Sequence, residues 1–195
     1  MLDNLSNYKV ILGSNSPRRR ELLAGLDIDF EVKVVPGIEE SYPDTLATHE
    51  IPAFLAEKKA MAYKSSMTPD ELLITADTIV WTHNTVLGKP ADREEAVKML
   101  RLLSGCKHEV ITGVCLSTQE RTESFSVVSE VCFASLTDEE IGYYVDKYRP
   151  FDKAGAYGIQ EWIGYVGVES INGSFYNVMG LPVQRLYNEL KQFVS

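Results

Sequence analysis

Runs of apolar and polar residues predict a chain in which strands and helices follow one another. The apolar run at residues 10–12 predicts a buried strand, and the alternation at 30–35 predicts a strand with one solvated face. Residues 72–81 are so apolar and β-branched that they predict a central strand. The predicted strands are 8–13, 30–35, 72–81, 109–117 and 122–135, the last two forming an antiparallel hairpin around the polar turn 118–121.

Predicted helices start at residues that cap exposed backbone N–H groups. Ser16 is an N-cap before a proline, and Asp92 with Glu95 and Thr137 with Glu140 form capping-box patterns. A hairpin tip is expected at 83–84, and the stretch 151–182, rich in Gly and aromatic residues, is assigned no element. The predicted helices are 17–26, 52–63, 92–103, 138–147 and 183–193.

The first predicted helix breaks a local rule, because Arg18, Arg19 and Arg20 stand in its first turn. The helix dipole is positive there, so each cation costs a few tenths of a kcal/mol. A strand, a turn of small residues and a helix N-terminus also form a cradle for anions, and guanidinium groups suit a polyphosphate. We interpret this stretch as a substrate site, with a solvated basic turn as the alternative.

Composition limits the class of protein. A chain of 195 residues with 45% hydrophobic content can bury a full core and is expected to form one domain, with room for two lobes around a cleft. A net charge of −9 argues against binding to nucleic acid or to an anionic membrane. The three cysteines have no CxxC spacing, which favours a reducing cytosol over a disulfide framework or a zinc ribbon. No leader or membrane span is expected.

Asp77 is the first candidate for chemistry, because aspartate is depleted in strands and a carboxylate buried without a partner costs several kcal/mol. The alternatives are a hydrogen-bonded core aspartate and a strand that ends before this residue. Lys89 in a GKP corner and the acidic pair Glu39 and Glu40 are weaker candidates, since such residues are usually solvated. The histidines lack metal or nucleophile spacing, and no P-loop or dinucleotide-binding glycine motif occurs. Carboxylates that act together with a hard cation are therefore the remaining candidate chemistry.

Six short motifs in order resemble the Maf family of nucleotide pyrophosphatases over nearly the whole chain. The motifs are SNSPRR at 14–19, LA at 55–56 with KA at 59–60, ADT at 76–78, GKP at 88–90, DKAGAYGIQ at 152–160, and GS at 173–174 with NV at 177–178 and GLP at 180–182. The resemblance implies an elongated α/β domain over residues 1–195, with a mixed twisted sheet flanked by helices and two lobes around a central cleft. It further implies hydrolysis of a nucleoside triphosphate to the monophosphate and pyrophosphate, a divalent cation (Mg²⁺ or Mn²⁺), a cytoplasmic location and a homodimer.

The resemblance also implies roles for single residues. Asp77 corresponds to the general base and, with Glu40, to a metal ligand. Lys59 is chosen over Lys58 because the family places this lysine directly before alanine. Alignment is loose in the loop 38–51, which leaves Glu39 and Glu40 both open. The set implied to bind the triphosphate and its metal is Ser14, Arg18, Arg19, Glu40, Lys59 and Lys89.

Arg18, Thr78 and Gln160 resemble the branch of the family that accepts dTTP and UTP. A side-chain amide at Gln160 offers both a donor and an acceptor to the base edge of uracil or thymine. Two alternatives stay open. One is a pyrophosphatase for purine or modified nucleotides, and the other is a non-catalytic regulator of cell division.

Overall fold

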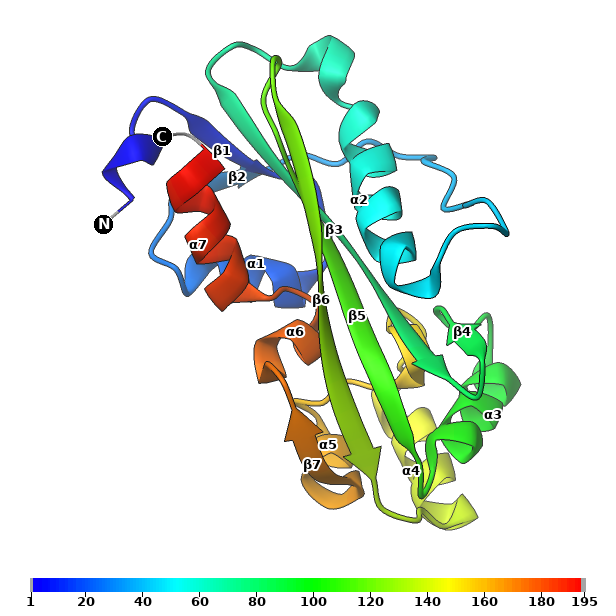
Figure 1. Ribbon diagram of the computed structural model, residues 1–195. Helices are drawn as coiled ribbons and strands as arrows, with labels where there is room; N and C mark the ends of the chain where they lie inside the picture. The colour runs from blue at the N-terminus through cyan, green and yellow to red at the C-terminus, as the bar shows by residue number, and fades with distance from the viewer. Residues whose placement is uncertain (1, 194–195) are drawn as a thin grey trace. The chain divides into compact units, whose positions relative to one another are not determined.

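The computed structural model describes residues 2–193 and contains a seven-stranded mixed sheet flanked by helices (Figure 1). Along the sheet the strand order is β2-β1-β3-β5-β6-β7, and β4 pairs with β3. The strands are β1 (Lys9–Leu12), β2 (Phe30–Val32), β3 (Glu71–Thr82), β4 (Thr85–Leu87), β5 (Lys107–Ser117), β6 (Thr122–Phe133) and β7 (Val168–Asn172). The helices are α1 (Pro17–Ala24), α2 (Ile51–Met61), α3 (Arg93–Leu103), α4 (Asp138–Tyr148), α5 (Trp162–Gly167), α6 (Phe175–Met179) and α7 (Val183–Phe193).

Strand pairing shows why the sheet is mixed. β1 pairs in parallel with β2 and with β3, whereas β4 runs antiparallel to β3 and β7 runs antiparallel to β6. Parallel neighbours need a crossover, and α1 supplies it between β1 and β2. The mixed α/β sheet flanked by helices confirms the predicted fold class.

The chain divides into two compact units. The first comprises the described residues of Met1–Asp77, Thr112–Val127 and Gly180–Ser195, and the second comprises Thr78–Ile111 and Val128–Met179. The boundary on β3 falls between Asp77 and Thr78. A single functional domain with a central cleft stays a prediction.

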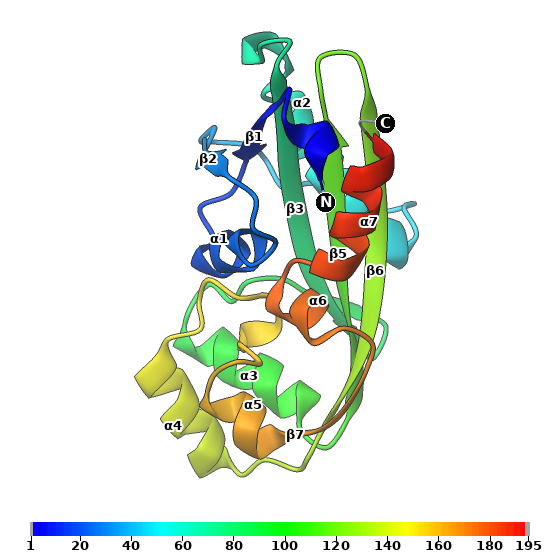
Figure 2. The ribbon, with the colours of Figure 1, turned by 90° about the vertical axis from the view of Figure 1, so that its left-hand side faces the viewer.

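Helices α2 and α7 cover opposite faces of the strands in the first unit (Figures 1 and 2). α2 lies unusually close to β5, because a Cβ atom added to Gly113 would fall 2.1 Å from the backbone nitrogen of Ala53. Thr75 on β3 donates its hydroxyl to the carbonyl oxygen of Ala56 at 2.6 Å. Only a glycine at position 113 permits this approach, which fixes α2 against the sheet.

The second unit is built around a pair of helices, α3 and α4, that lie side by side (Figure 2). Arg93 on α3 donates to Asp146 on α4 at 2.6 Å. In the same unit the aromatic rings of Phe133 and Tyr157 pack edge to face, with centroids 4.9 Å apart. These contacts give the second unit its own core.

Most predicted elements are present, with small differences at their ends. Positive φ angles at His83 and Asn84 (46° and 58°) confirm the hairpin tip. Thr137 and Glu140 form the full capping box. Asp92 caps the amide of Glu95 at 2.9 Å, but the Glu95 carboxylate accepts from Ala91 instead of Asp92.

One expectation was wrong, and one stretch without an assignment contains regular elements. The strand predicted at 30–35 covers only Phe30–Val32, because β1 ends at Leu12, opposite Val32. The amide of Lys33 still donates to the oxygen of Leu12 at 3.2 Å. The unassigned stretch 151–182 contains α5, β7 and α6. No described helix is long and apolar enough to cross a membrane.

Candidate active site

Asp77 lies near the middle of β3, and its side chain is paired. The residue is 8% exposed, and the Nζ atom of Lys59 on α2 lies 2.5 Å from its Oδ1 atom. The ammonium group compensates the cost of burying this carboxylate. Asp77 is therefore a charged group held at a defined place, next to a second functional side chain.

Lys59 also contacts a second carboxylate. Its Nζ atom lies 2.8 Å from Oε1 of Glu40, whose side chain is 45% exposed, so one ammonium group bridges a buried and an exposed carboxylate. The contact is with Glu40, which favours Glu40 over Glu39 as the acidic residue of the site. The three side chains come from three parts of the first unit: the loop after β2, α2 and β3.

Arg19 is held in place by two backbone carbonyl groups. Its Nε donates to the oxygen of Gly180 at 2.9 Å, and an NH group donates to the oxygen of Ala76 at 2.8 Å. Burial lowers the pKa of Arg19, while the charges of Asp77 and Glu40 act in the opposite direction. A guanidinium of this kind keeps its charge and has a fixed orientation beside the carboxylates.

The loop between β1 and α1 has the local structure that the sequence predicted. Ser16 caps α1 by accepting from the amide of Arg19, and Ser14 accepts from the amide of Ser16 at 3.2 Å. Arg18 is half-buried in the first turn and lies close enough to lower the pKa of Arg19 further. Ser14, Arg18 and Arg19 thus line one helix N-terminus in the same unit as Asp77.

The other three predicted residues, Thr78, Lys89 and Gln160, belong to the second unit. Thr78 follows Asp77 on β3, so its side chain points to the opposite face of the strand. The amide of Gly155 donates to the oxygen of Gly88 at 3.0 Å, which joins the segment that carries Gln160 to the corner that carries Lys89. Gly155 needs φ of 67°, and a Cβ atom there would lie 2.8 Å from the Val80 side chain.

The Gln160 side chain has an unusual feature. Its Oε1 atom is buried and accepts no hydrogen bond from any described residue. Buried polar atoms are nearly always paired, and an exception calls for an explanation such as a ligand or water. The Oε1 atom of Gln160 could therefore accept a hydrogen bond from a bound ligand.

Tyr157, three residues before Gln160, anchors the segment that carries Gln160. The hydroxyl of Tyr157 lies 2.7 Å from Nε2 of His108 on β5, and both residues are buried. Burial lowers the pKa of His108 to about 4, so the imidazole is neutral. His108 therefore has a packing role, in agreement with the absence of a catalytic histidine spacing.

Two carboxylates, Asp77 and Glu40, are the candidate metal ligands. Within residues 2–193 no group of three or more His, Cys, Asp or Glu side chains is arranged to hold a metal ion. Mg²⁺ usually needs only one or two protein carboxylates, since waters and substrate phosphates supply its other oxygens. The pair shares one ammonium cation, which shows that the two carboxylates can approach a common positive charge. This donor set fits a hard divalent cation that arrives with a triphosphate.

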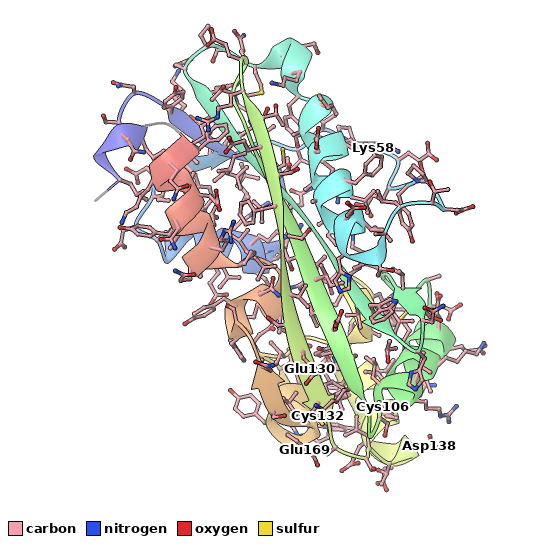
Figure 3. The ribbon with its side chains drawn as sticks, viewed as in Figure 1. Lys58, Cys106, Glu130, Cys132, Asp138 and Glu169 are labelled. Atoms are coloured by element: carbon pink, nitrogen blue, oxygen red, sulfur yellow. The ribbon has the colours of Figure 1, made fainter. Side chains whose placement is uncertain are left out.

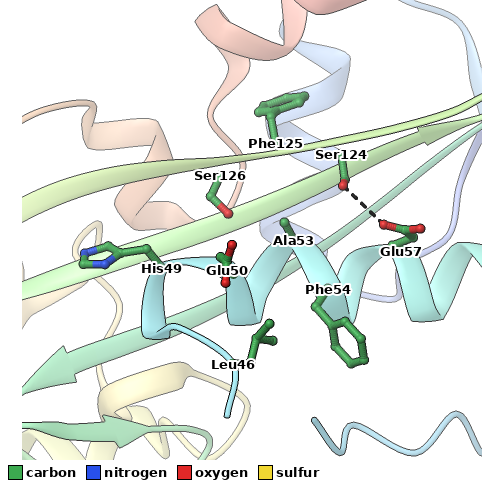
Figure 4. Close-up of a pocket in the computed structure, with 9 residues that line it drawn as sticks. All are labelled: Leu46, His49, Glu50, Ala53, Phe54, Glu57, Ser124, Phe125 and Ser126. Carbon is green, nitrogen blue, oxygen red and sulfur yellow. Dashed lines mark hydrogen bonds between the residues drawn. The ribbon is translucent and has the colours of Figure 1, made fainter. Parts of the chain in front are cut away.

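A surface hollow of about 410 Å³ beside the start of α2 is not suited to a triphosphate (Figure 4). None of the nine residues that line it is a lysine or an arginine. Glu50 and Glu57 would repel a polyanion. The remaining lining residues are Leu46, His49, Ala53, Phe54, Ser124, Phe125 and Ser126.

The cysteines take no part in the arrangement around Asp77. Cys106, Cys115 and Cys132 are free thiols. Figure 3 labels Cys132 and Glu169 on the neighbouring strands β6 and β7, where Sγ lies 3.5 Å from Oε2. Burial and then Glu169 raise the pKa of Cys132, which keeps the thiol protonated.

The sequence did not identify Lys153 and Glu161 as residues of interest. Lys153 is 8% exposed, and its Nζ atom lies 3.2 Å from Oε1 of Glu161. A signal was present, because a lysine directly precedes residues 154–159, which are mostly small or apolar, and a glutamate follows them after Gln160. A buried cation so placed needs a counter-charge nearby.

Comparison with known proteins gives consistent results. The family described as Maf-like protein matches residues 9–193. A dTTP/UTP pyrophosphatase of Parabacteroides distasonis is 67% identical over 193 residues, which cover 99% of this chain and 100% of that protein. A dTTP/UTP pyrophosphatase of Bacteroides fragilis is 62% identical, covering 98% of this chain and 100% of that one.

More distant likenesses were also found. A dTTP/UTP pyrophosphatase of Flavobacterium psychrophilum is 51% identical, covering 93% of this chain and 92% of that one. The solved structure of a HAM1 protein from Coxiella burnetii shares 16% sequence identity, covers 95% of this chain and 99% of that chain, and has a TM-score of 0.46.

Proposed function

The chain belongs to the family of Maf-like proteins, and from this membership we propose a nucleoside triphosphate pyrophosphatase that acts on dTTP and UTP. The reaction converts the triphosphate and water to the monophosphate and pyrophosphate. Relatives that carry this name are 51–67% identical to this chain and match 93–99% of it. The enzyme is therefore a hydrolase of phosphoanhydride bonds.

The bridge from Asp77 through Lys59 to Glu40 supports the chemistry most directly. Asp77 acts as the general base: Lys59 contacts Oδ1, and Oδ2 is the atom assigned to the attacking water. The water proton passes to Oδ2 as the oxygen attacks the α-phosphorus, and the bond to the pyrophosphate oxygen breaks. Lys59 holds the carboxylate in a fixed orientation before substrate arrives.

Cations in the first turn of α1 bind the phosphates. Arg19 is oriented by the carbonyl groups of Ala76 and Gly180, and its guanidinium charge is assigned to the phosphate oxygens. Arg18 and the Ser14 loop add a charge and hydrogen-bonding groups at the same helix N-terminus. Lys89 is assigned to the leaving pyrophosphate, where positive charge stabilises the developing negative charge.

Asp77 and Glu40 would hold a divalent cation, Mg²⁺ or Mn²⁺, which when bound neutralises charge on the phosphoryl oxygens. Oxygen ligands favour such a hard ion over zinc. With such a cation bound, the ammonium group of Lys59 would be repelled from the carboxylates and would be available to the phosphate oxygens.

Gln160 is assigned to read the base, and Thr78 and Arg18 are the other residues assigned to nucleotide specificity. The unpartnered Oε1 atom of Gln160 can accept the N3–H of uracil or thymine, and its NH₂ group can donate to a carbonyl oxygen of the base. Cytosine lacks that N3–H. A non-catalytic regulator of cell division would not need the paired Asp77, and a purine-specific enzyme would not need this amide. A homodimer and a cytoplasmic location stay predictions.

A single screen tests the proposal. The purified protein is incubated with each common and modified nucleoside triphosphate in the presence of Mg²⁺ or Mn²⁺, and release of pyrophosphate is measured. We expect dTTP and UTP to give the highest kcat/KM. A protein that releases no pyrophosphate from any of these nucleotides would contradict the assignment, and a preference for a purine nucleotide would contradict its pyrimidine part.

A further inference from the structure

Gln160 lies in a four-residue turn whose two ends are held by one hydroxyl group. The amide of Glu161 donates to the oxygen of Gly158 at 2.9 Å, which closes the turn over residues 158–161. At the first end, the amide of Gly158 donates to the hydroxyl of Tyr144 at 2.9 Å. At the other end, the same hydroxyl donates to Oε2 of Glu161.

The second carboxylate oxygen of Glu161 is also held. Lys153 lies 3.2 Å from Oε1 of Glu161 and 2.8 Å from Oδ1 of Asp152. There is little space around these groups, because a Cβ atom at Gly158 would lie 3.0 Å from both the Lys153 and the Glu161 side chains. Both oxygens of Glu161 thus have donors on two sides of the turn.

Tyr144 itself is held by the packing of α4. The residue is fully buried, and its ring stacks on Tyr148 with centroids 5.1 Å apart. Burial raises the pKa of the Tyr144 hydroxyl, and Glu161 adds to the rise, so the group stays protonated and able to donate. A rigid helix therefore sets the position of the turn.

We propose that Tyr144, with Glu161 and Lys153, is a positioning residue for base selection, because these three side chains fix the turn that presents the Gln160 amide. The proposal rests on the proposed function, in which Gln160 reads the base. Discrimination between uracil and cytosine depends on which of two similar groups faces the amide, so a small displacement of the amide weakens it. Residues outside this turn are assigned to bind the phosphates, and Lys59 contacts Asp77. The rate of hydrolysis should therefore depend less on this turn than the choice of base does.

Tyr144→Phe is the first test, because it removes the hydroxyl and keeps the ring that stacks on Tyr148. Tyr143→Phe is the matched control, since Tyr143 is its exposed neighbour on α4 and its hydroxyl contacts Lys147 instead. We expect the ratio of kcat/KM for UTP over CTP to fall about tenfold in Tyr144→Phe and to stay unchanged in Tyr143→Phe. The kcat for UTP should fall by less than about threefold.

A double variant separates positioning from a general structural effect. In the Gln160→Ala background, Tyr144→Phe should leave the UTP over CTP ratio unchanged, because the group that it positions is absent. An equal fall in both backgrounds would show that Tyr144 acts through another residue and would overturn the proposal. An unchanged ratio in the single Tyr144→Phe variant would overturn it as well.

Failure of the proposed base reading gives a different result. If Gln160→Ala keeps the wild-type ratio, Gln160 does not read the base, and both ideas fail together. If Gln160→Ala lowers the ratio and Tyr144→Phe does not, only the positioning role fails. Should Tyr144→Phe not fold, Glu161→Gln replaces it, because this isosteric change keeps an acceptor for the hydroxyl and removes the charge that holds Lys153. The ratio should then fall in the same direction, and an unchanged ratio would reject the role.

Discussion

The ammonium nitrogen of Lys59 lies 2.5 Å from Oδ1 of Asp77, and the same nitrogen lies 2.8 Å from Oε1 of Glu40. One positive charge thus occupies the position between two carboxylates that a divalent cation would share. If the proposed divalent cation binds here, Lys59 competes with it for these oxygens while no nucleotide is bound. The arrangement keeps two like charges close together at low cost.

Replacing Lys59 should strengthen metal binding in the absence of nucleotide. Lys59→Met removes the competing charge, so the affinity for Mn²⁺ should rise about tenfold or more, while hydrolysis is lost with the phosphate contact. Paramagnetic resonance of free Mn²⁺ measures the affinity without any turnover. Lys58→Met is the control, because Lys58 (labelled in Figure 3) contacts Ser41 at 2.9 Å instead of the two carboxylates. Equal affinity in the Lys59 variant and the wild type would refute this competition.

Asp77→Asn should abolish most of the activity and keep the fold. The side chains are nearly isosteric, but the amide cannot accept a proton from water, so kcat should fall about 10²- to 10⁴-fold. Steady-state kinetics with UTP and circular dichroism give the two measurements. Asp70→Asn, just before the same strand, should keep full kcat. A variant at Asp77 with more than about a tenth of the wild-type kcat would exclude the base role.

The bond that is cleaved can be located with labelled water. Attack at the α-phosphorus should release pyrophosphate in one step and place solvent ¹⁸O in the nucleoside monophosphate. Mass spectrometry of both products after a single turnover shows where the label lies. Label in pyrophosphate would place the attack at the β-phosphorus, and formation of a nucleoside diphosphate with orthophosphate would mean a different reaction.

Gln160→Ala should change the choice of base more than the rate of hydrolysis. Uracil and thymine offer an N3–H and flanking carbonyl groups, whereas cytosine offers an amino group and no N3–H, so like groups would face each other. We expect dTTP and UTP well ahead of CTP, ATP and GTP in the wild type, and a reduced UTP over CTP ratio in the variant. Competition assays with paired substrates measure the ratio directly. An unchanged ratio would remove Gln160 from base recognition.

Acid should destabilise the first unit through Glu71. The hydrogen bond from Lys33 lowers the pKa of the buried Glu71 below its ordinary value of 4.5. A group with a lowered pKa contributes stability above its unfolded value and loses it as the pH falls through the folded value. The melting temperature should therefore drop below about pH 4.5, less steeply in Glu71→Gln than in the wild type. Glu120→Gln in the exposed turn should follow the wild type, and a Glu71 variant with the same slope would contradict the assignment.

Most of the fold could be predicted because its signals are local. The cap at Thr137 and the period of apolar residues in 183–193 act within one or two turns of helix, and both elements formed where expected. The elements α5, β7 and α6 were missed because each is five or six residues long, too short for a periodic pattern. Gly164 serves close packing there: a Cβ atom would lie 1.6 Å from the oxygen of Ile159.

The candidate site was predictable as a set of residue types, but its contacts were not. Asp77 was conspicuous because a carboxylate in an apolar strand is costly. The lysine-alanine motif of the family identified Lys59 rather than Lys58, but its contact with Asp77 depends on how α2 packs on β3. The role of Tyr144 could not be predicted for the same reason, because its hydroxyl contacts a turn that lies fourteen to seventeen residues later in the chain.

The contact between Gly113 and Ala53 sets a limit on how this enzyme can be redesigned. Any side chain at position 113 would push α2 away from the sheet, since the added atom would fall 2.1 Å from the backbone. Lys59 lies on the same rigid helix, six residues beyond Ala53, and would move with it. A library that varies the substrate pocket for a new nucleotide should therefore keep position 113 constant, although it lies outside the set of residues that handle substrate.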